Sequence, residues 1–139
     1  MIVRHLELHV SSGGDGEVLD LTAGVARSVK EAGIGDGTVT VFVPGSTAAI
    51  TTIEFEPGLR QDFPLAMERF APRNISYAHD RTWHDGNGHA HVRASAIGPS
   101  LTVPVAAGKP MLGTWQQIVL VDFDNRPRER RVVVTVMGE

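Results

Sequence analysis

Four of the six histidines in this chain, His79, His84, His89 and His91, lie within thirteen residues of one another. Neutral imidazoles bind zinc and other divalent metals, and protonated imidazoles bind anions. His89 and His91 are two residues apart, so a strand over Gly88 to Ile97 would place both side chains on one face. The alternation in H-V-R-A-S-A-I and the Gly-Pro pair after it favour that strand. The segment therefore predicts a site for one ion or one anion.

A second candidate feature is the turn Gly45-Ser46-Thr47, which follows a proline. Small residues with hydroxyl groups leave backbone N–H groups exposed, and such groups can bind a phosphate. The segment R-P-R-E-R-R supplies four arginines, of which we expect one, Arg128, to contact the phosphate and the others to lie at a solvated hairpin end. The alternative for Gly45, Ser46 and Thr47 is an ordinary turn without a ligand.

The length and composition of the chain argue against several classes of function. The 139 residues predict a single domain over residues 1–139, and the net charge of -3 gives no basic surface for nucleic acid. No apolar run approaches the ~20 residues of a membrane span, and the charged N-terminus is unlike a signal peptide. The absence of cysteine excludes thiol nucleophiles and thiolate zinc sites. We expect a cytoplasmic protein with no nucleic-acid or membrane partner.

The dominant hydrophobic period is two, which predicts strands. The V-V-V-T-V run near the C-terminus predicts a strand that is buried on both faces or lies between subunits. The expected strands are Ile2–Val10, Thr38–Val43, Ala48–Glu54, Leu101–Val105, Thr114–Phe123 and Arg131–Met137.

Two segments predict helices. The first begins at the N-cap Thr22 and ends at Gly33, which can adopt the left-handed C-cap conformation. The second spans Leu59–Phe70, where Pro64 is compatible with a helix that begins near Asp62. About two helices among many strands predict an α+β fold with mostly antiparallel, sandwich-like β-sheets.

Four segments follow one another along the chain: T-V-T-V-F-V-P-G-S-T-A-A-I-T-T-I-E, N-G-H-A-H-V-R-A-S-A-I-G-P-S-L-T-V-P-V, G-K-P-M-L-G-T-W-Q-Q-I-V-L-V-D-F-D and R-R-V-V-V-T-V-M-G-E. Their most specific part is A-H-x-x-A-x-x-x-G followed by G-T-W-Q-x-I. In this order and spacing the segments resemble the YjbQ-like family, also called the secondary thiamine-phosphate synthase family. The resemblance covers nearly the whole chain and implies a compact homotrimer with thiamine-phosphate synthase activity.

Two positions depart from the family pattern. Where many members have H-T-S or H-T-T, this chain has Gly45-Ser46-Thr47, and where they have I-N-E it has Thr52-Ile53-Glu54. A family histidine and a family asparagine are therefore replaced by Gly45 and Ile53.

With the resemblance, the histidines form a predicted site. His79, His89 and His91 are the expected metal ligands for zinc or magnesium, and Glu54, His89 and His91 are the expected catalytic residues. The alternative is that H-x-H places two inert, hydrogen-bonded rings on a solvated or subunit-facing surface. His84 is expected to be a loop residue.

Trp115 and Gln116 match the family pattern as well. Trp115 could stack on a heteroaromatic ring while Gln116 binds its edge, or Trp115 could lie in the core or a trimer interface. Two functions stay open. One is an enzyme that joins an aminopyrimidine diphosphate to a thiazole phosphate at a site between subunits. The other is a non-catalytic trimer that binds a metal ion or a small phosphorylated molecule.

Overall fold

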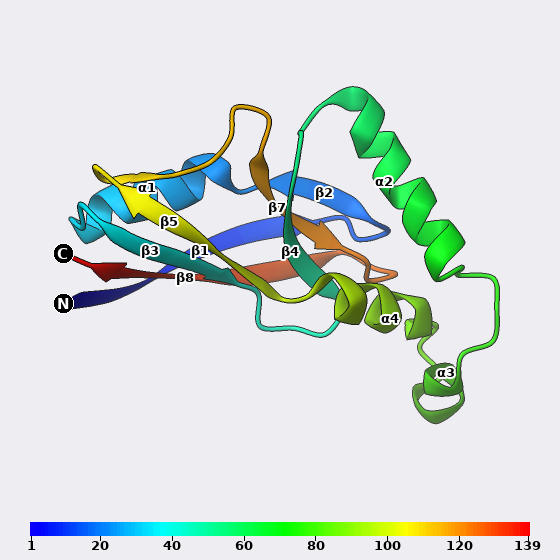
Figure 1. Cartoon of the computed structure of the whole chain (residues 1–139). Coiled ribbons are helices and arrows are strands. Elements are labelled where there is room, and N and C mark those ends of the chain that lie inside the picture. Colours follow the sequence, from blue (N-terminus) through cyan, green and yellow to red (C-terminus); the bar gives the residue numbers. More distant parts are fainter.

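Eight strands and four helices make up the computed structural model, which describes residues 1–139 (Figure 1). The strands form two antiparallel sheets, with orders β1-β8-β3-β5-β6 and β2-β7-β4. The expected α+β class and antiparallel sheets are confirmed. In chain order the elements are β1 (Ile2–Ser12), β2 (Glu17–Asp20), α1 (Thr22–Ala32), β3 (Gly37–Phe42), β4 (Ala48–Ile53), α2 (Pro57–Phe70), α3 (Ala78–Trp83), α4 (Gly88–Ile97), β5 (Ser100–Ala106), β6 (Lys109–Pro110), β7 (Gln117–Asp122) and β8 (Arg128–Gly138).

The two sheets share one hydrophobic core. Alternate residues of β8, namely Val132, Val134 and Val136, are fully buried and pack with residues of β3, β5, β7 and α1. Val133 and Thr135 on the other face of β8 are only half-buried. The V-V-V-T-V run is therefore buried on one face within the chain, so the first alternative, burial on both faces, is wrong, and a position between subunits stays a prediction.

The strand that is buried on both faces is β7. Ile118, Val119, Leu120 and Val121 all have no exposed surface. Ile118 and Leu120 belong to the shared core, whereas Val119 and Val121 pack with α4 and half-buried side chains of α2. The small sheet is thus the middle layer of the molecule.

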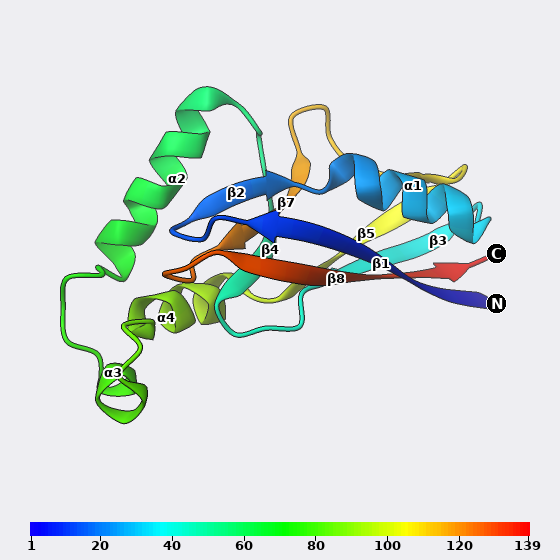
Figure 2. The same cartoon turned by 180° about the vertical axis from the view of Figure 1, so that it is seen from behind.

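The helices divide between the two ends of the molecule. α1 lies near both chain termini, while α2, α3 and α4 gather at the opposite end, and the view from behind agrees (Figures 1 and 2). No helix is both long and apolar enough to cross a membrane.

The strand expected over Gly88–Ile97 is wrong, because this segment is the helix α4. Ala90 and Ala94, four residues apart, are buried against the small sheet, and alanine is the strongest helix former. The apparent alternation came from small residues, which fit either structure. The packing of α4 on its neighbours therefore determines that this segment is a helix rather than a strand.

The second expected helix begins earlier than Pro64 seemed to permit. α2 starts at Pro57, and the carboxylate of its N-cap, Glu56, accepts the N–H groups of Gly58 and Leu59. Pro64 therefore lies inside the helix and removes one internal hydrogen bond. α2 has no fully buried residue and contacts the core through half-buried side chains such as Phe63 and Met67.

In α1 the expected C-cap Gly33 is confirmed, with φ 70°. The expected N-cap Thr22 is wrong: Leu21 is the N-cap, and Thr22 is the first helical residue, whose hydroxyl accepts the N–H of Ile118 at 2.9 Å instead of capping the helix.

Candidate functional site

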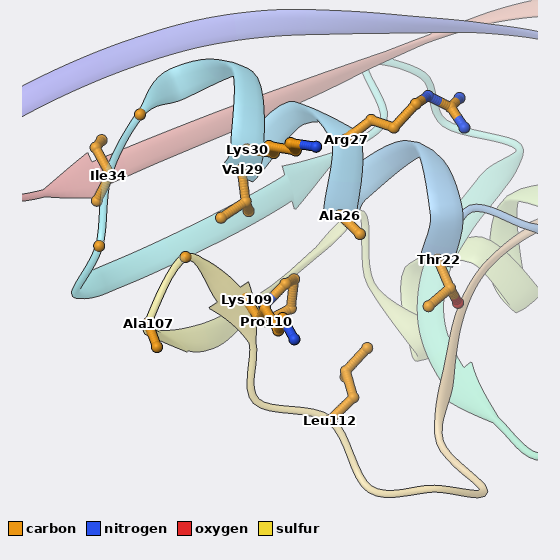
Figure 3. Close-up of a pocket in the computed structure, with 13 residues that line it drawn as sticks. Thr22, Ala26, Arg27, Val29, Lys30, Ile34, Ala107, Lys109, Pro110 and Leu112 are labelled. Atoms are coloured by element: carbon orange, nitrogen blue, oxygen red, sulfur yellow. The ribbon is translucent and has the colours of Figure 1, made fainter.

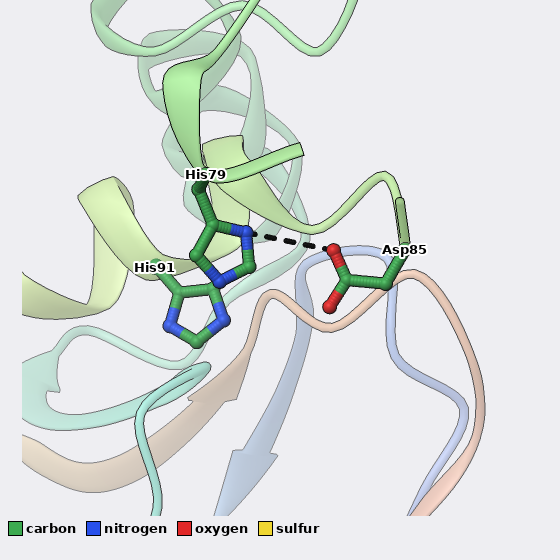
Figure 4. A group of neighbouring side chains, drawn as sticks. All are labelled: His79, Asp85 and His91. Carbon is green, nitrogen blue, oxygen red and sulfur yellow. Dashed lines mark ion pairs between the residues drawn. The ribbon is translucent and has the colours of Figure 1, made fainter. Parts of the chain in front are cut away.

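His79, Asp85 and His91 converge at the end of the molecule that α3 and α4 form (Figure 4). His79 lies in the first turn of α3, His91 lies in the first turn of α4, and Asp85 lies in the connection between them. One ligand atom from each lies within 4.8 Å of the others, and the two imidazole centroids are 4.1 Å apart. Two imidazoles and a carboxylate are a donor set that zinc and related metals use.

A tight connection brings α4 against α3. α3 ends at His84, which has φ 54° and donates its N–H to the Asp80 carbonyl at 2.8 Å. The Asp80 carboxylate accepts the N–H of Gly88 at 2.9 Å. A Cβ at Gly88 would lie 2.4 Å from the Cβ of Tyr77, so only glycine permits this approach.

The electrostatics of this cluster leave one nitrogen without a partner. Nδ1 of His79 is buried and makes no hydrogen bond, although it lies 3.5 Å from Oδ1 of Asp85. An unpaired buried polar atom is destabilising, and a bound cation would satisfy it. Burial, and then the neighbouring His79, lower the pKa of His91. A lowered pKa favours the neutral imidazole, which is the form that binds a metal ion.

His89 faces away from this cluster. Residues two apart on a helix are separated by about 200°, so His89 and His91 cannot share a face. His89 is 3% exposed and its Nε2 has no hydrogen-bond partner. Burial, followed by the charge of Arg93, lowers its pKa. The shared face predicted for His89 and His91 is therefore wrong, and the structure leaves His89 outside the cluster of possible ligands.

The turn at Gly45 to Thr47 is held by a buried ion pair. The Thr47 hydroxyl donates to Oδ2 of Asp124 at 3.0 Å and accepts from the Arg130 guanidinium at 2.8 Å. Arg130 also donates through two nitrogens to the fully buried carboxylate of Asp122, at 2.7 and 2.9 Å. These bonds fix both the turn and the guanidinium.

Several donors of this turn have no acceptor within the chain. The backbone N–H groups of Gly45, Ser46 and Thr47 make no hydrogen bond, and neither does Nη1 of Arg130. That nitrogen lies 3.0 Å from the point where a Cβ at Gly45 would be. Glycine at this position therefore leaves the guanidinium accessible. Arg128 is bound through Nε to Asp124 at 3.0 Å and is about one-third exposed.

Asp124 connects the turn to the histidine cluster. Burial alone would raise the pKa of Asp124, but hydrogen bonds from Thr47, Asn87 and Arg128 outweigh it and hold the pKa below its usual range. The next residue, Asn125, donates its N–H to Asn87 and its side-chain amide to the Asp85 carbonyl, at 2.9 and 2.7 Å. The turn and the histidine cluster are thus adjacent.

Glu54, Trp115 and Gln116 lie elsewhere. In the β4–β7 pair, Ala48 is opposite Asp122 and Ile53 is opposite Gln117. Glu54 and Trp115 therefore lie at the far end of this pair, about 20 Å along the strands from Asp124. Both are exposed, Trp115 by 73%, and Gln116 donates to the Thr52 hydroxyl at 3.3 Å. The strand expected from Thr114 begins only at Gln117.

Sequence reasoning missed Asp85 as a partner of the histidines and Arg130 as the arginine of the turn. Asp85 had a signal, because D-G-N-G after a short helix predicts a reversal of the chain. Arg130 also had one: it shares the parity of the buried Val132 and Val134 along β8.

Several known proteins are similar to this chain in sequence. The family described as "UPF0047 protein YjbQ-like" matches residues 6–139. A UPF0047 protein of Archaeoglobus fulgidus is 40% identical over 132 residues, which cover 95% of this chain and 100% of the relative. A UPF0047 protein of Mycobacterium tuberculosis is 43% identical over 70% of this chain and 72% of its own.

Solved structures of similar proteins have the same fold. A YbjQ-like protein of unknown function from Sulfolobus solfataricus superposes with a TM-score of 0.94 at 36% identity, and covers 99% of both chains. A hypothetical protein from Aeropyrum pernix gives a TM-score of 0.90 at 33% identity, over 98% of this chain and 99% of its own. The family match and these relatives confirm the resemblance found in the sequence: the chain belongs to the YjbQ-like, or UPF0047, family.

Proposed function

We propose that this protein binds a divalent metal ion through His79, Asp85 and His91, and binds a small phosphorylated molecule beside it. The observation that carries the proposal is the buried, unpaired Nδ1 of His79, which lies 3.5 Å from the Asp85 carboxylate in a group whose ligand atoms, including one of His91, lie within 4.8 Å of one another. Two imidazoles favour zinc over magnesium, which prefers oxygen ligands. With three protein ligands, a fourth position stays open for water or a ligand oxygen.

The phosphate would bind at the turn next to this cluster. Oxyanions are bound in proteins by unpaired backbone N–H groups and by arginine. Gly45, Ser46 and Thr47 supply the N–H groups, and Arg130 supplies a guanidinium nitrogen that is already oriented by Asp122. Arg128 donates to the same Asp124 carboxylate and is a second candidate.

The reaction proposed for this site is thiamine-phosphate synthesis. In that reaction the C–O bond to diphosphate breaks, the benzylic carbon gains positive charge, and the thiazole nitrogen forms the new C–N bond. A bound divalent ion would neutralise charge on the leaving diphosphate. The chain's own part is to hold phosphate oxygens at Gly45 to Thr47 and Arg130 and so to orient the leaving group.

The replaced family residues favour the non-catalytic alternative. Gly45 and Ile53 carry no group that can transfer a proton or bind a metal. In this version the same residues bind metal and phosphate without turnover. Product formation from the two phosphorylated substrates, measured with zinc-loaded protein, distinguishes the enzyme from the binding protein.

We also propose a homotrimer in which a second copy completes the site. Glu54 and Trp115 match the family pattern but lie about 20 Å along the strands from Asp124 in the same chain. A second subunit could bring them to the histidine cluster. Light scattering at micromolar concentration should report three chains per particle, and a monomer would contradict the proposal.

The metal site is tested by metal content and zinc titration. We expect about one zinc per chain, and more than about 100-fold weaker binding after His79→Ala or His91→Ala, because each change removes a ligand. His84→Asn is the matched control, since asparagine tolerates the left-handed conformation of this exposed residue. Equal zinc affinity in all four proteins would refute the site.

A further inference from the structure

A cavity of about 880 Å³, widely open to solvent, lies at the end of the molecule opposite to the histidine cluster (Figures 1 and 3). It is bordered by α1, by the loop that follows α1, and by β6 with the segment after it. This volume is in the range of small-molecule sites. The residues that line it are Thr22, Ala26, Arg27, Val29, Lys30, Gly33, Ile34, Gly35, Ala107, Gly108, Lys109, Pro110 and Leu112.

The floor of the cavity is apolar and fixed. Ala26, Pro110 and Leu112 are half-buried and form its accessible apolar surface, whereas Val29 and Ile34 belong to the main core and are fully buried. Figure 3 shows Ala26 and Val29 directed from α1 toward Pro110 and Leu112, with open space between them. Such a surface binds the hydrocarbon part of a ligand.

The rim of the cavity is cationic. Lys30 and Lys109 are the only two lysines in the chain, and both line this cavity together with Arg27. No aspartate or glutamate is among the lining residues. None of the three cations forms an ion pair with a carboxylate of the chain. Lys109 lies beside Pro110, whereas Arg27 points away from the cavity (Figure 3).

We propose that this cavity binds a small anionic amphiphile, with an apolar body on Ala26 and Leu112 and a carboxylate or phosphate head at Lys109. The apolar floor favours the body, and the unpaired lysines favour the anionic head over a neutral or cationic one. This site does not depend on the function proposed for the histidine cluster, because no residue is shared between them.

The two lysines permit a direct experiment. Reductive methylation with ¹³C-formaldehyde labels Lys30, Lys109 and the α-amino group of Met1, and keeps all three charges. Octanoate should shift the Lys109 and Lys30 signals in ¹³C NMR spectra and leave the Met1 signal in place. Octanol, which has the same chain without the charge, should bind at least about tenfold more weakly, because a charge-assisted contact is lost.

Substitutions locate the ligand. Lys109→Glu should weaken octanoate binding by about tenfold or more, and Ala26→Phe should abolish it by filling the floor. Arg69→Glu and Ala66→Phe are matched controls on exposed positions of α2 and should bind as the original chain does. Circular dichroism would verify that each variant is folded.

Three results would overturn the proposal. Unmoved lysine signals up to millimolar octanoate would exclude the ligand class. Equal binding of octanol and octanoate would exclude the role of the lysines. Lysine signals that change with protein concentration alone, together with a larger particle in light scattering, would show that a second copy of the chain occupies the cavity.

Discussion

Charged side chains are paired at one end of this molecule and unpaired at the other. At the end near α3 and α4, Asp122 and Asp124 are buried and paired with the partly buried Arg130 and Arg128, and each hydrogen bond fixes a neighbouring group. At the α1 end, Lys30 and Lys109 are exposed and unpaired above an apolar floor. The first arrangement orients a ligand in one geometry, whereas the second attracts an anion without directing it. The difference predicts that removing a charged side chain lowers stability strongly at the first end and only slightly at the second.

Removing Arg130 should have the largest effect. Arg130→Ala leaves the fully buried carboxylate of Asp122 without its partner, so we expect the free energy of unfolding to fall by about 3–5 kcal/mol. Urea unfolding measures this change. Arg131→Ala is the control, because its pair with Glu7 is exposed to solvent and should contribute little to stability. Similar losses for both variants would contradict the distinction between buried and exposed pairs.

Closing the contact between α3 and α4 should have the next largest effect. Gly88→Ala places a methyl group 2.4 Å from the Cβ of Tyr77 and must move one helix. We expect a loss of about 1–3 kcal/mol in stability and weaker zinc binding, because His79 and His91 lie on the two helices. Ser95→Ala on the exposed face of α4 is the control for both measurements. Unchanged zinc affinity in Gly88→Ala would separate the helix contact from the site.

The pH dependence of stability in metal-free protein should be a smaller effect, and His89 should contribute to it. The pKa of His89 is lowered from 6.5 by burial and by Arg93, so the unfolded chain binds a proton that the folded chain does not. Its contribution to stability is therefore retained above pH 6.5 and lost as pH falls below 6.5 toward the folded pKa. Urea midpoints between pH 7.5 and 5.5, with a chelator present, should fall less in His89→Gln than in the original chain. Parallel curves would show that His89 does not titrate with folding.

The smallest effect should come from the α1 end. Lys109→Gln removes an exposed, unpaired charge, so the unfolding free energy should change by less than about 0.5 kcal/mol while octanoate binding weakens. This result, set beside Arg130→Ala, would complete the contrast between the two ends. A loss of several kcal/mol at Lys109 would mean that the lysine supports the fold.

Local pattern predicted the strands and the first helix well. β-branched residues at alternate positions give β3, β4 and β8, and Gly33 ends α1 in the left-handed conformation, as expected. The short strands β2 and β6 carry too few residues for a period to show. α4 was missed because Ala90 and Ala94 select a helix only through their contact with the small sheet.

The candidate site was predictable in its residue types more than in its geometry. The density of histidines indicated a site, and the structure brings His79 and His91 together. The helical period of α4 turns His89 into the interior. Asp85 is the third group of the cluster because the turn after α3 brings it there. Their roles as ligands, and those of Glu54 and Trp115, remain predictions.

Asp124 has a consequence for how the two proposed ligands act on each other. It holds Thr47 of the phosphate turn, and its charge also acts on His91 of the metal cluster. A cation at His91 would add positive charge next to a region where Arg128 and Arg130 are already neutralised by Asp124 and Asp122. Linkage is reciprocal, so the factor by which metal raises phosphate affinity equals the factor by which phosphate raises metal affinity. The protein would therefore retain its metal most tightly when its phosphorylated ligand is abundant.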